Sequence, residues 1–360
     1  MGKFLHNIER FIKIIAKRFV QNNYTPIKID KAKRIFPVRS YCKILLLRHD
    51  RLGDVLISTP FLKALRELMP EANIDILLSY KNMTLAPAAG RFIDNVLVLE
   101  NSPRLFIKLI SGIRKKHYDL IIDLLDNEST TSNLIMKFSL ANNKLGFDKS
   151  NANNYNYVVP IPNRGQVHIA RRLFSLLLPF GATEPPDKIN IELPLNKDSV
   201  SKAARLLGKK EKSIRLGINL TGSNESKYWG DNHYIDFINE IKAVSDVECL
   251  LFAVPRIMAR AERISDATGA KLAPLQSDFY IYVAMLNECD IILTPDTVAV
   301  HIAAALDKPV IALFHSPEPD KLMPWYPLCS HSKSIVAKYS ITEIKVKQVL
   351  SAFIELMGAE

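Results

Sequence analysis

The chain has 360 residues, enough for two domains, and its 48% hydrophobic and 24% charged residues are typical of a globular protein. This composition excludes a disordered, fibrous or low-complexity chain, and no run reaches the ~18 apolar residues that a membrane-spanning helix needs. The net charge of +11 is concentrated at one end, since residues 1–40 hold ten Lys/Arg and two acidic residues and the rest of the chain is nearly neutral.

The cysteines are scattered along the chain, at Cys42, Cys249, Cys289 and Cys329, with no CxxC pair and no Cys/His cluster. This spacing argues against a disulfide scaffold and a structural zinc site, and it favours a reduced, cytoplasmic compartment. The N-terminus lacks the compact apolar region and the cleavage site of a secretion signal.

The first forty residues form a basic N-terminal extension. Within it, residues 3–20 carry an apolar stripe at helical spacing, with His6, Arg10, Lys13 and Lys17 on the opposite face. This pattern predicts a helix that lies flat on an anionic membrane surface, although the same stripe would also suit packing against the body of the protein. Because the positive charge is confined to this segment, nucleic-acid binding is not expected.

Strands and helices alternate through the body of the chain. In residues 41–193 the pattern predicts strands at 44–47, 74–78, 96–99 and 120–124, with helices at 54–68 and 105–115. In residues 194–341 it predicts strands at 214–220, 249–253, 291–293 and 310–314, with helices at 197–207, 234–241, 257–266, 280–286 and 298–306. Residues 342–360 are expected to form a closing helix.

This order predicts an α/β fold with two Rossmann-like domains facing a cleft, each built on a mainly parallel sheet. In such sheets, ligands bind beyond the carboxyl ends of the strands. The chain has no glycine-rich dinucleotide fingerprint, no Walker A loop and no D-x-D pair, so any phosphate chemistry must depend on backbone amides and cationic side chains.

The first motif, LLLRHDRLGDVLISTP, spans residues 45–60 and passes from a strand into a helix that is expected to open at Asp54. The helix dipole is expected to lower the pKa of this carboxyl group, and the ionised form can accept a proton from an incoming hydroxyl group. The alternative is that Asp54 only caps its helix, as Asp often does.

Two further motifs follow a strand in the second half of the chain. Residues 216–234 place Thr221, Gly222, Ser223 and Lys227 after a strand, a combination that suits a diphosphate but would also suit a solvated loop. Residues 292–321 place Asp296 and Thr297 at the start of a helix that also carries His301. A lone histidine in that position is more often a packed structural residue than a ligand.

Together the three motifs resemble glycosyltransferase family 9, the ADP-heptose:lipopolysaccharide heptosyltransferases. The first motif resembles the R-x-D-x-x-G-D loop and helix of that family. The second is similar to its S-K-x-W segment, and the third to its D-[ST]-G-x-x-H helix. The resemblance covers residues 43–345 and implies a GT-B fold, with the acceptor bound by the N-terminal domain and the nucleotide sugar by the C-terminal domain.

The resemblance also implies roles for individual residues. Asp54 would be the general base, and Lys227, with Thr221, Gly222 and Ser223, would contact the donor diphosphate and stabilise its developing charge. The nucleotide-sugar pocket would be lined by Asp296, Thr297, the amide of Val298 and His301. The implied reaction is an inverting transfer of a heptose or related sugar without a metal or any cofactor. It would use ADP-heptose and a phosphorylated glycolipid acceptor at the inner face of the bacterial inner membrane.

Two positions depart from the family pattern. The family usually has glycine where this chain has Val298, and an acid for the ribose where this chain has Arg256, Ile257 and Met258. These departures favour two alternatives, a divergent member that uses another nucleotide sugar and a binding or assembly protein that has lost transfer. A nucleotide-sugar epimerase of similar architecture is disfavoured because no additional acid/base motif is present.

Overall fold

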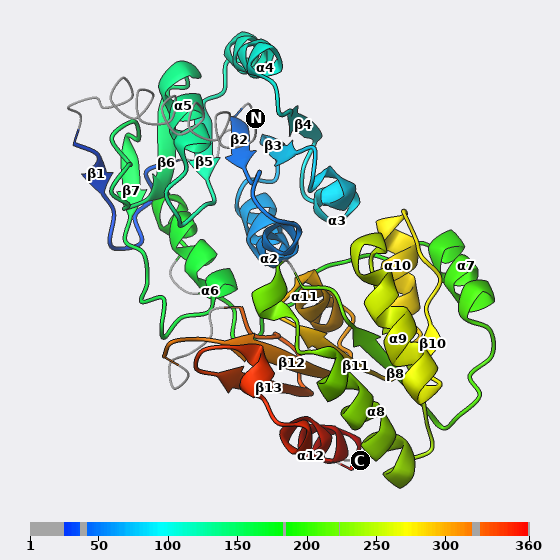
Figure 1. Ribbon diagram of the computed structural model, residues 1–360. Helices are drawn as coiled ribbons and strands as arrows, with labels where there is room; N and C mark the ends of the chain where they lie inside the picture. Colours follow the sequence, from blue (N-terminus) through cyan, green and yellow to red (C-terminus); the bar gives the residue numbers. More distant parts are fainter. Residues whose placement is uncertain (1–24, 37–41, 183–184, 223, 319–324, 359–360) are drawn as a thin grey trace, which may run out of the picture. The chain divides into compact units, whose positions relative to one another are not determined.

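The computed structural model describes residues 25–36, 42–182, 185–222, 224–318 and 325–358 (Figure 1). The helix predicted over residues 3–20 lies outside these ranges. The chain divides into two compact units, the first ending at Ile189 and the second beginning at Asn190, whereas the sequence pattern places the domain boundary after residue 193. Each unit is a parallel sheet covered by helices, which confirms the predicted α/β class.

The described part of the first unit contains one parallel sheet of seven strands in the order β1-β7-β6-β5-β2-β3-β4. Its strands are β1 (Ile27–Lys28), β2 (Lys43–Leu47), β3 (Asn73–Ser79), β4 (Asn95–Leu99), β5 (Leu120–Asp123), β6 (Asn143–Phe147) and β7 (Tyr157–Val159). Central strand β2 has four consecutive buried Ile and Leu side chains because helices cover both faces of the sheet. Residues 27 and 28, which the sequence analysis places in the N-terminal extension, pair with β7 at the sheet edge.

The helices of the first unit lie on the two faces of this sheet. They are α2 (Leu52–Leu68), α3 (Ala86–Ala89), α4 (Pro103–Lys116), α5 (Thr130–Phe138) and α6 (Ile169–Phe174), with 3-10 turns η1 (Met83–Leu85) and η2 (Ser175–Phe180). Helices α4 and α5 pack on β2, β3 and β5 in one apolar cluster, whereas α2 contacts α3 and α6. The four strands and two helices that the sequence predicts in this unit are confirmed, with ends shifted by at most two residues.

In the second unit, the described residues form a parallel sheet of six strands in the order β10-β9-β8-β11-β12-β13. The strands are β8 (Ile214–Asn219), β9 (Val247–Phe252), β10 (Lys271–Leu272), β11 (Ile291–Pro295), β12 (Val310–His315) and β13 (Ser332–Ala337). The helices are α7 (Lys197–Leu207), α8 (Asp231–Val244), α9 (Met258–Thr268), α10 (Phe279–Asn287), α11 (Val298–Ala305) and α12 (Val346–Met357), with 3-10 turns η3 (Glu225–Lys227), η4 (Pro255–Ile257) and η5 (Ile341–Glu343).

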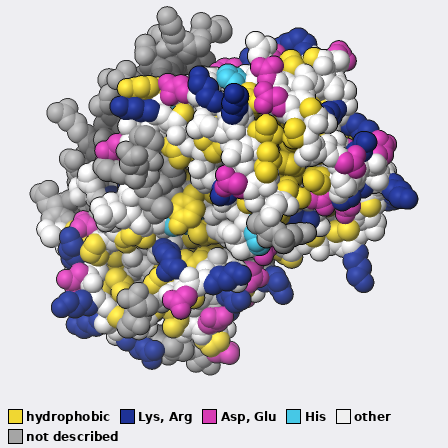
Figure 2. Space-filling model, turned by 90° about the horizontal axis from the view of Figure 1, so that it is seen from below, with side chains coloured by type: hydrophobic (Ala, Val, Ile, Leu, Met, Phe, Trp, Pro, Cys, Tyr) yellow, Lys and Arg dark blue, Asp and Glu magenta, His cyan; other side chains and the backbone are white. Residues whose placement is uncertain are grey.

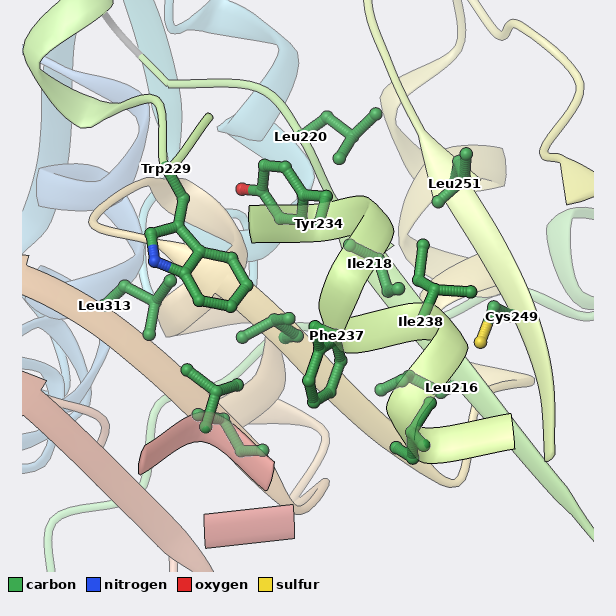
Figure 3. Close-up of a cluster of buried hydrophobic side chains, with 14 of the residues drawn as sticks. Leu216, Ile218, Leu220, Trp229, Tyr234, Phe237, Ile238, Cys249, Leu251 and Leu313 are labelled. Atoms are coloured by element: carbon green, nitrogen blue, oxygen red, sulfur yellow. The ribbon is translucent and has the colours of Figure 1, made fainter. Parts of the chain in front are cut away.

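Trp229 belongs to the core that α8 forms with the second sheet (Figure 3). It is fully buried, and its ring meets that of Tyr234 edge-on with 5.2 Å between the ring centres. Its Nε1 donates a hydrogen bond of 2.9 Å to the carbonyl oxygen of Ile344, which anchors the segment before α12. This packing fixes the chain that immediately follows Lys227.

The sequence pattern missed several short elements. Strands β6, β7 and β13 and helices α5 and α6 were not predicted, because each is short or mixes polar with apolar residues. The closing helix α12 begins at Val346 rather than at residue 342, because residues 341–343 form the 3-10 turn η5. Among the described helices, none combines the length and the apolarity needed to cross a membrane.

Candidate functional site

Asp54 lies in the first turn of α2, just beyond the carboxyl end of β2. The helix begins at Leu52, two residues earlier than predicted, with Arg51 as its N-cap residue. The backbone N–H of Arg51 donates a hydrogen bond to the Asp54 carboxylate, so this side chain does help to cap the helix. The side chain is only partly buried, which leaves it open to a further partner.

The predicted lowering of the Asp54 pKa is wrong. Burial, reinforced by the negative charge of Asp50, raises the pKa of Asp54 to about 6, against the opposing effects of the Arg48 and Arg51 charges and of the hydrogen bond from the Arg51 backbone N–H. Burial therefore outweighs the charges and the hydrogen bond that favour the ionised form. A carboxyl group with this pKa is still largely ionised at neutral pH, and it is a stronger base than an ordinary aspartate.

Buried Arg48 connects the strand end to the first turns of α2. Its Nη1 donates to Oδ2 of Asp50 at 2.9 Å and its Nε donates to Oγ of Ser58 at 2.6 Å. The Ser58 hydroxyl group in turn donates to the backbone carbonyl oxygen of Asp54 at 2.7 Å. Arg48 thus holds Asp50 and the backbone of Asp54 in one hydrogen-bonded chain.

Sequence reasoning gave no individual role to Arg48, Asp50 or Ser58. Nη2 of Arg48 and Oδ1 of Asp50 are buried and have no hydrogen-bond partner among the described residues. A buried polar atom without a hydrogen-bond partner lowers the stability of the fold. Such unpaired atoms are typical of a site where a ligand or solvent supplies the missing partner. The sequence did carry a signal for this site, because the charged residues Arg48 and Asp50 closely follow an apolar strand.

A second polar cluster lies at the end of the neighbouring strand β5. Buried Asp123 accepts hydrogen bonds from Nζ of Lys149 at 2.8 Å and from the hydroxyl group of Tyr155 at 2.7 Å. Burial would raise the pKa of Asp123, but Lys149 and Tyr155 hold that pKa below its usual value. Burial also lowers the pKa of His49, whose Nε2 lies 3.5 Å from the Ser129 hydroxyl group.

In the second unit, Lys227 and Asp296 come together from two separate loops. Lys227 ends η3 after β8, and Asp296 directly follows β11. The ammonium group of Lys227 forms an ion pair with the Asp296 carboxylate and also donates to the Asp296 carbonyl oxygen at 3.1 Å. Because the two strands are parallel neighbours, their carboxyl ends meet at one edge of the sheet.

Asn219 connects the residues around this pair. Its Nδ2 donates to Oγ1 of Thr294 at 2.9 Å and to Oγ1 of Thr297 at 3.0 Å, and its Oδ1 accepts from the backbone N–H of Thr221 at 3.1 Å. Thr297 is the N-cap of α11 and accepts from the N–H of Ala299. Asn219 and Thr294 were missed because an amide or hydroxyl side chain at a strand end has no distinctive spacing.

Gly222 has a steric reason to be glycine. A Cβ atom at this position would lie 2.7 Å from the carbonyl oxygen of Lys227 and 2.8 Å from its Cβ atom. Only glycine therefore lets this turn pass so close to Lys227. The Gly222 carbonyl oxygen also accepts a hydrogen bond from Arg256, the residue found where the family usually has an acid for the ribose.

His301 is buried on α11, and its Nδ1 has no hydrogen-bond partner within the described part of the chain. Burial, helped by the positive charge of Lys227, lowers the pKa of His301 to about 4, so the ring is neutral at physiological pH. Val298 is the first residue of α11 and its φ is not left-handed. Its side chain, which glycine lacks, is partly buried.

The structure therefore brings most of the predicted donor residues to one edge of the second sheet. These are Thr221, Gly222, Lys227, Asp296, Thr297, Val298 and His301. Ser223 lies outside the described residues, and Asp54 belongs to the first unit. Within the described ranges, no three His, Cys, Asp or Glu side chains are grouped as metal ligands.

Comparison with known proteins identifies the family. The sequence model of glycosyltransferase family 9 (heptosyltransferase) matches residues 106–348. Lipopolysaccharide heptosyltransferase 3 of Escherichia coli (strain K12) is 24% identical over 297 residues, which cover 76% of this chain and 82% of the relative.

Two solved structures have the same fold at 18% sequence identity. A glycosyl transferase family 9 protein from Veillonella parvula DSM 2008 matches with a TM-score of 0.76 over 91% of this chain and 99% of its own. The E. coli heptosyltransferase WaaC with ADP matches with a TM-score of 0.69 over 87% and 99%, respectively. Because the family model spans well over half of its length, this chain belongs to glycosyltransferase family 9 and is a glycosyltransferase.

Proposed function

We propose that the protein transfers a heptose or a related sugar from ADP-heptose to a lipopolysaccharide core or a similar glycolipid. The first unit would bind the acceptor and the second unit the donor. Family membership supports the reaction class, and the names of the relatives, which include a lipopolysaccharide heptosyltransferase and an ADP complex, support these substrates.

The donor half of the proposal depends on Lys227 and the N-terminus of α11. The Lys227 ammonium group, the amides at the start of α11 and the hydroxyl groups of Thr221 and Thr297 are the donors that a diphosphate needs. A diphosphate entering this site would compete with Asp296 for Lys227. The neutral His301 ring, with its unpaired Nδ1, is suited to a hydrogen bond with an uncharged part of the nucleotide sugar.

The acceptor half depends on Asp54, whose raised pKa is the single observation that carries the mechanism. Asp54 would take the proton from an acceptor hydroxyl group as that oxygen attacks the anomeric carbon of the sugar. The bond from this carbon to the diphosphate breaks, the nucleoside diphosphate leaves with the electron pair, and the configuration inverts. Lys227 would stabilise the negative charge that develops on the leaving group, so no metal is required.

We place this activity on the cytoplasmic side of the inner membrane, where the predicted helix over residues 3–20 would hold the enzyme on anionic lipid. The direct test is a transfer assay with a panel of nucleotide sugars and a core glycolipid. Selective product formation with ADP-heptose, lost in Asp54→Asn, supports the proposal. Thermal shifts with the same panel identify the donor independently of turnover.

A second candidate function is supported by Val298 and Arg256. Val298 stands where the family usually has glycine, and Arg256 donates to the Gly222 carbonyl oxygen instead of offering a carboxylate to a ribose. These two observations favour a divergent member with another donor, or a binding protein without transfer. Product formed from a different nucleotide sugar would support the former, and binding without product the latter.

A further inference from the structure

Large apolar side chains are exposed on helices α4 and α5 of the first unit and just after α5. Figure 1 shows where these two helices lie. Ile107 on α4 is 70% exposed, Phe138 at the end of α5 is 39% exposed, and Leu140 just after it is 70% exposed. The opposite sides of both helices are buried together in the apolar cluster on the first sheet. The exposed side chains therefore add nothing to that core.

These apolar residues belong to one surface because α4 and the end of α5 are joined directly. Nε of Arg114 on α4 donates a hydrogen bond of 2.6 Å to the carbonyl oxygen of Phe138. Ile107 precedes Arg114 by two helical turns, so it lies on the same side of α4. We call this region, made of Arg104, Ile107, Lys108, Phe138 and Leu140, the α4–α5 surface.

Leu140 is exposed in a conformation that disfavours leucine. Its φ of 59° is left-handed, a region that glycine, asparagine and aspartate occupy more readily. A buried contact that would compensate for this strain is missing, since most of the side chain is exposed. The described part of the folded chain therefore gives no reason for a leucine at this turn.

The charge on the same surface has only one sign. Helix α4 carries five Lys/Arg and no acidic residue, and α5 carries one lysine and no acidic residue. Arg104, Lys108 and Lys115 form no ion pair with any carboxylate in the described part of the chain.

Some exposed lysines elsewhere are neutralised by neighbouring acids. In the second unit, Lys202 pairs with Asp198 at 2.7 Å and Lys210 with Asp290 at 2.9 Å. The face drawn in Figure 2 shows the same mixture, with cationic and acidic side chains interspersed. Other exposed lysines, such as Lys197 and Lys347, also form no ion pair in the described part of the chain. The distinctive feature of α4 is that its unpaired cations share a helix with the exposed Ile107 and no acidic side chain.

We propose that the α4–α5 surface docks on an anionic lipid bilayer. Ile107, Phe138 and Leu140 would enter the interface between headgroups and acyl chains, while Arg104 and Lys108 contact lipid phosphates. The proposal extends the proposed function, because it gives the acceptor-binding unit a membrane contact separate from residues 3–20. A protein partner would require complementary acidic side chains, whereas a bilayer supplies a continuous anionic surface.

The test measures binding of the full chain to sedimenting vesicles of phosphatidylglycerol and phosphatidylethanolamine, with phosphatidylcholine vesicles as the neutral comparison. In Leu140→Asn the new asparagine tolerates the left-handed backbone, and in Ile107→Gln the new glutamine has a high helix propensity. Neither variant is therefore expected to disturb the fold. The double variant is expected to lower the partition coefficient about tenfold. The matched control is Ile354→Gln, at a 52% exposed position on α12 in the second unit, and it should bind like the unmodified protein.

Charge substitutions provide a second measurement. Each of Arg104→Gln and Lys108→Gln is expected to lower the partition coefficient on anionic vesicles about fivefold at low salt, and less at high salt. The proposal is overturned if the apolar variants bind anionic vesicles like the unmodified protein, or if neutral vesicles bind as well as anionic ones. A change in oligomeric state without a change in vesicle binding would also overturn it and would favour a protein partner.

The outcome is separable from that of the proposed function. Transfer to a water-soluble acceptor fragment and the thermal shift with ADP are expected to be unchanged in Leu140→Asn. If no nucleotide sugar is used but vesicle binding depends on the α4–α5 surface, the docking proposal stands and the proposed function fails. If transfer occurs and the surface variants bind vesicles like the unmodified protein, the proposed function stands and the docking proposal fails.

Discussion

Lys227 and Asp296 are 69 residues apart in the chain and form an ion pair at the carboxyl edge of the second sheet. The pair combines a cation that a diphosphate would bind with an anion that holds this cation in place. Removing the cation leaves the Asp296 carboxylate unpaired, which would repel a diphosphate.

Replacement of Lys227 by methionine tests this relationship. We expect Lys227→Met to lower kcat by about 100- to 1000-fold, equivalent to about 2.7–4 kcal/mol, because a positioned donor to the leaving group is lost. Steady-state kinetics with the identified donor measure the effect. The matched control is Lys202→Met, which removes an exposed cation paired with Asp198 on α7. Comparable losses in both variants would contradict a specific role for Lys227.

Asp54→Asn is expected to abolish transfer and to stabilise the protein at neutral pH. The folded-state pKa of about 6 lies above the ordinary 3.8, so the folded protein binds the proton more tightly and loses stability as the pH rises from about 4 to 6. Asparagine carries no charge, so Asp54→Asn removes the cost of burying an ionised carboxylate. The free energy of unfolding at pH 7 should therefore increase by about 1–3 kcal/mol, with no difference near pH 3.5. Denaturant titrations at the two pH values provide the measurement, and near-normal turnover in this variant would remove Asp54 from the mechanism.

The pH dependence of the reaction is expected to report the same group. We predict that kcat/KM rises through an apparent pKa of about 6 as Asp54 ionises. Asp50→Asn should move this limb to lower pH, because the negative charge of Asp50 is the second contribution to the raised pKa after burial. A pH–rate profile of the variant decides the question. An unchanged limb would mean that another group titrates there.

Val298→Gly tests why this position departs from the family pattern. If the valine side chain limits the approach of a phosphate to the first amide of α11, glycine should tighten binding of ADP by about two- to tenfold through an added hydrogen bond. Isothermal titration with ADP measures the change. Val300→Gly on the same helix is buried and is expected to lower stability without improving affinity. Equal or weaker ADP binding in Val298→Gly would mean that valine does not obstruct the donor.

Gly222→Ala probes the tight turn beside Lys227. The added Cβ would clash with the backbone of Lys227, so the turn must shift and carry the ammonium group with it. We expect weaker nucleotide binding and a lower Tm, because Gly222 is buried and the added Cβ meets backbone atoms. Gly112→Ala on α4, where a Cβ meets open space, is the control and should bind nucleotide normally. Unchanged nucleotide affinity in Gly222→Ala would show that the turn can move without displacing Lys227.

Much of the fold follows from local patterns. Strand β2 is predictable because four consecutive apolar residues are buried on both faces of a parallel sheet, and α7 is predictable because its apolar spacing is helical. Strands β6 and β13 were missed because a glycine or polar residues interrupt their pattern. Such strands form because neighbouring strands offer hydrogen-bond partners, which the local sequence does not reveal.

The residues of the candidate site also fall into two groups, those that the sequence reveals and those that only the folded structure reveals. Asp54, Lys227 and Asp296 are recognisable because each follows an apolar strand and belongs to a family motif. Arg48 and Asn219 are not, because their importance comes from hydrogen bonds to residues that folding brings near them. The direction of the Asp54 pKa shift was predicted wrongly for a related reason, since burial cannot be judged from one helix turn.

The sequence by itself determined the α/β class, most of the longer strands and helices, the family and the positions of the charged residues, because all of these depend on residue types at short spacing. Only the tertiary structure decided that Lys227 meets Asp296, that Asp54 has a raised pKa and that Leu140 is exposed in a left-handed turn. These features depend on solvent exclusion and on contacts between distant segments, which exist only after the parallel strands have assembled.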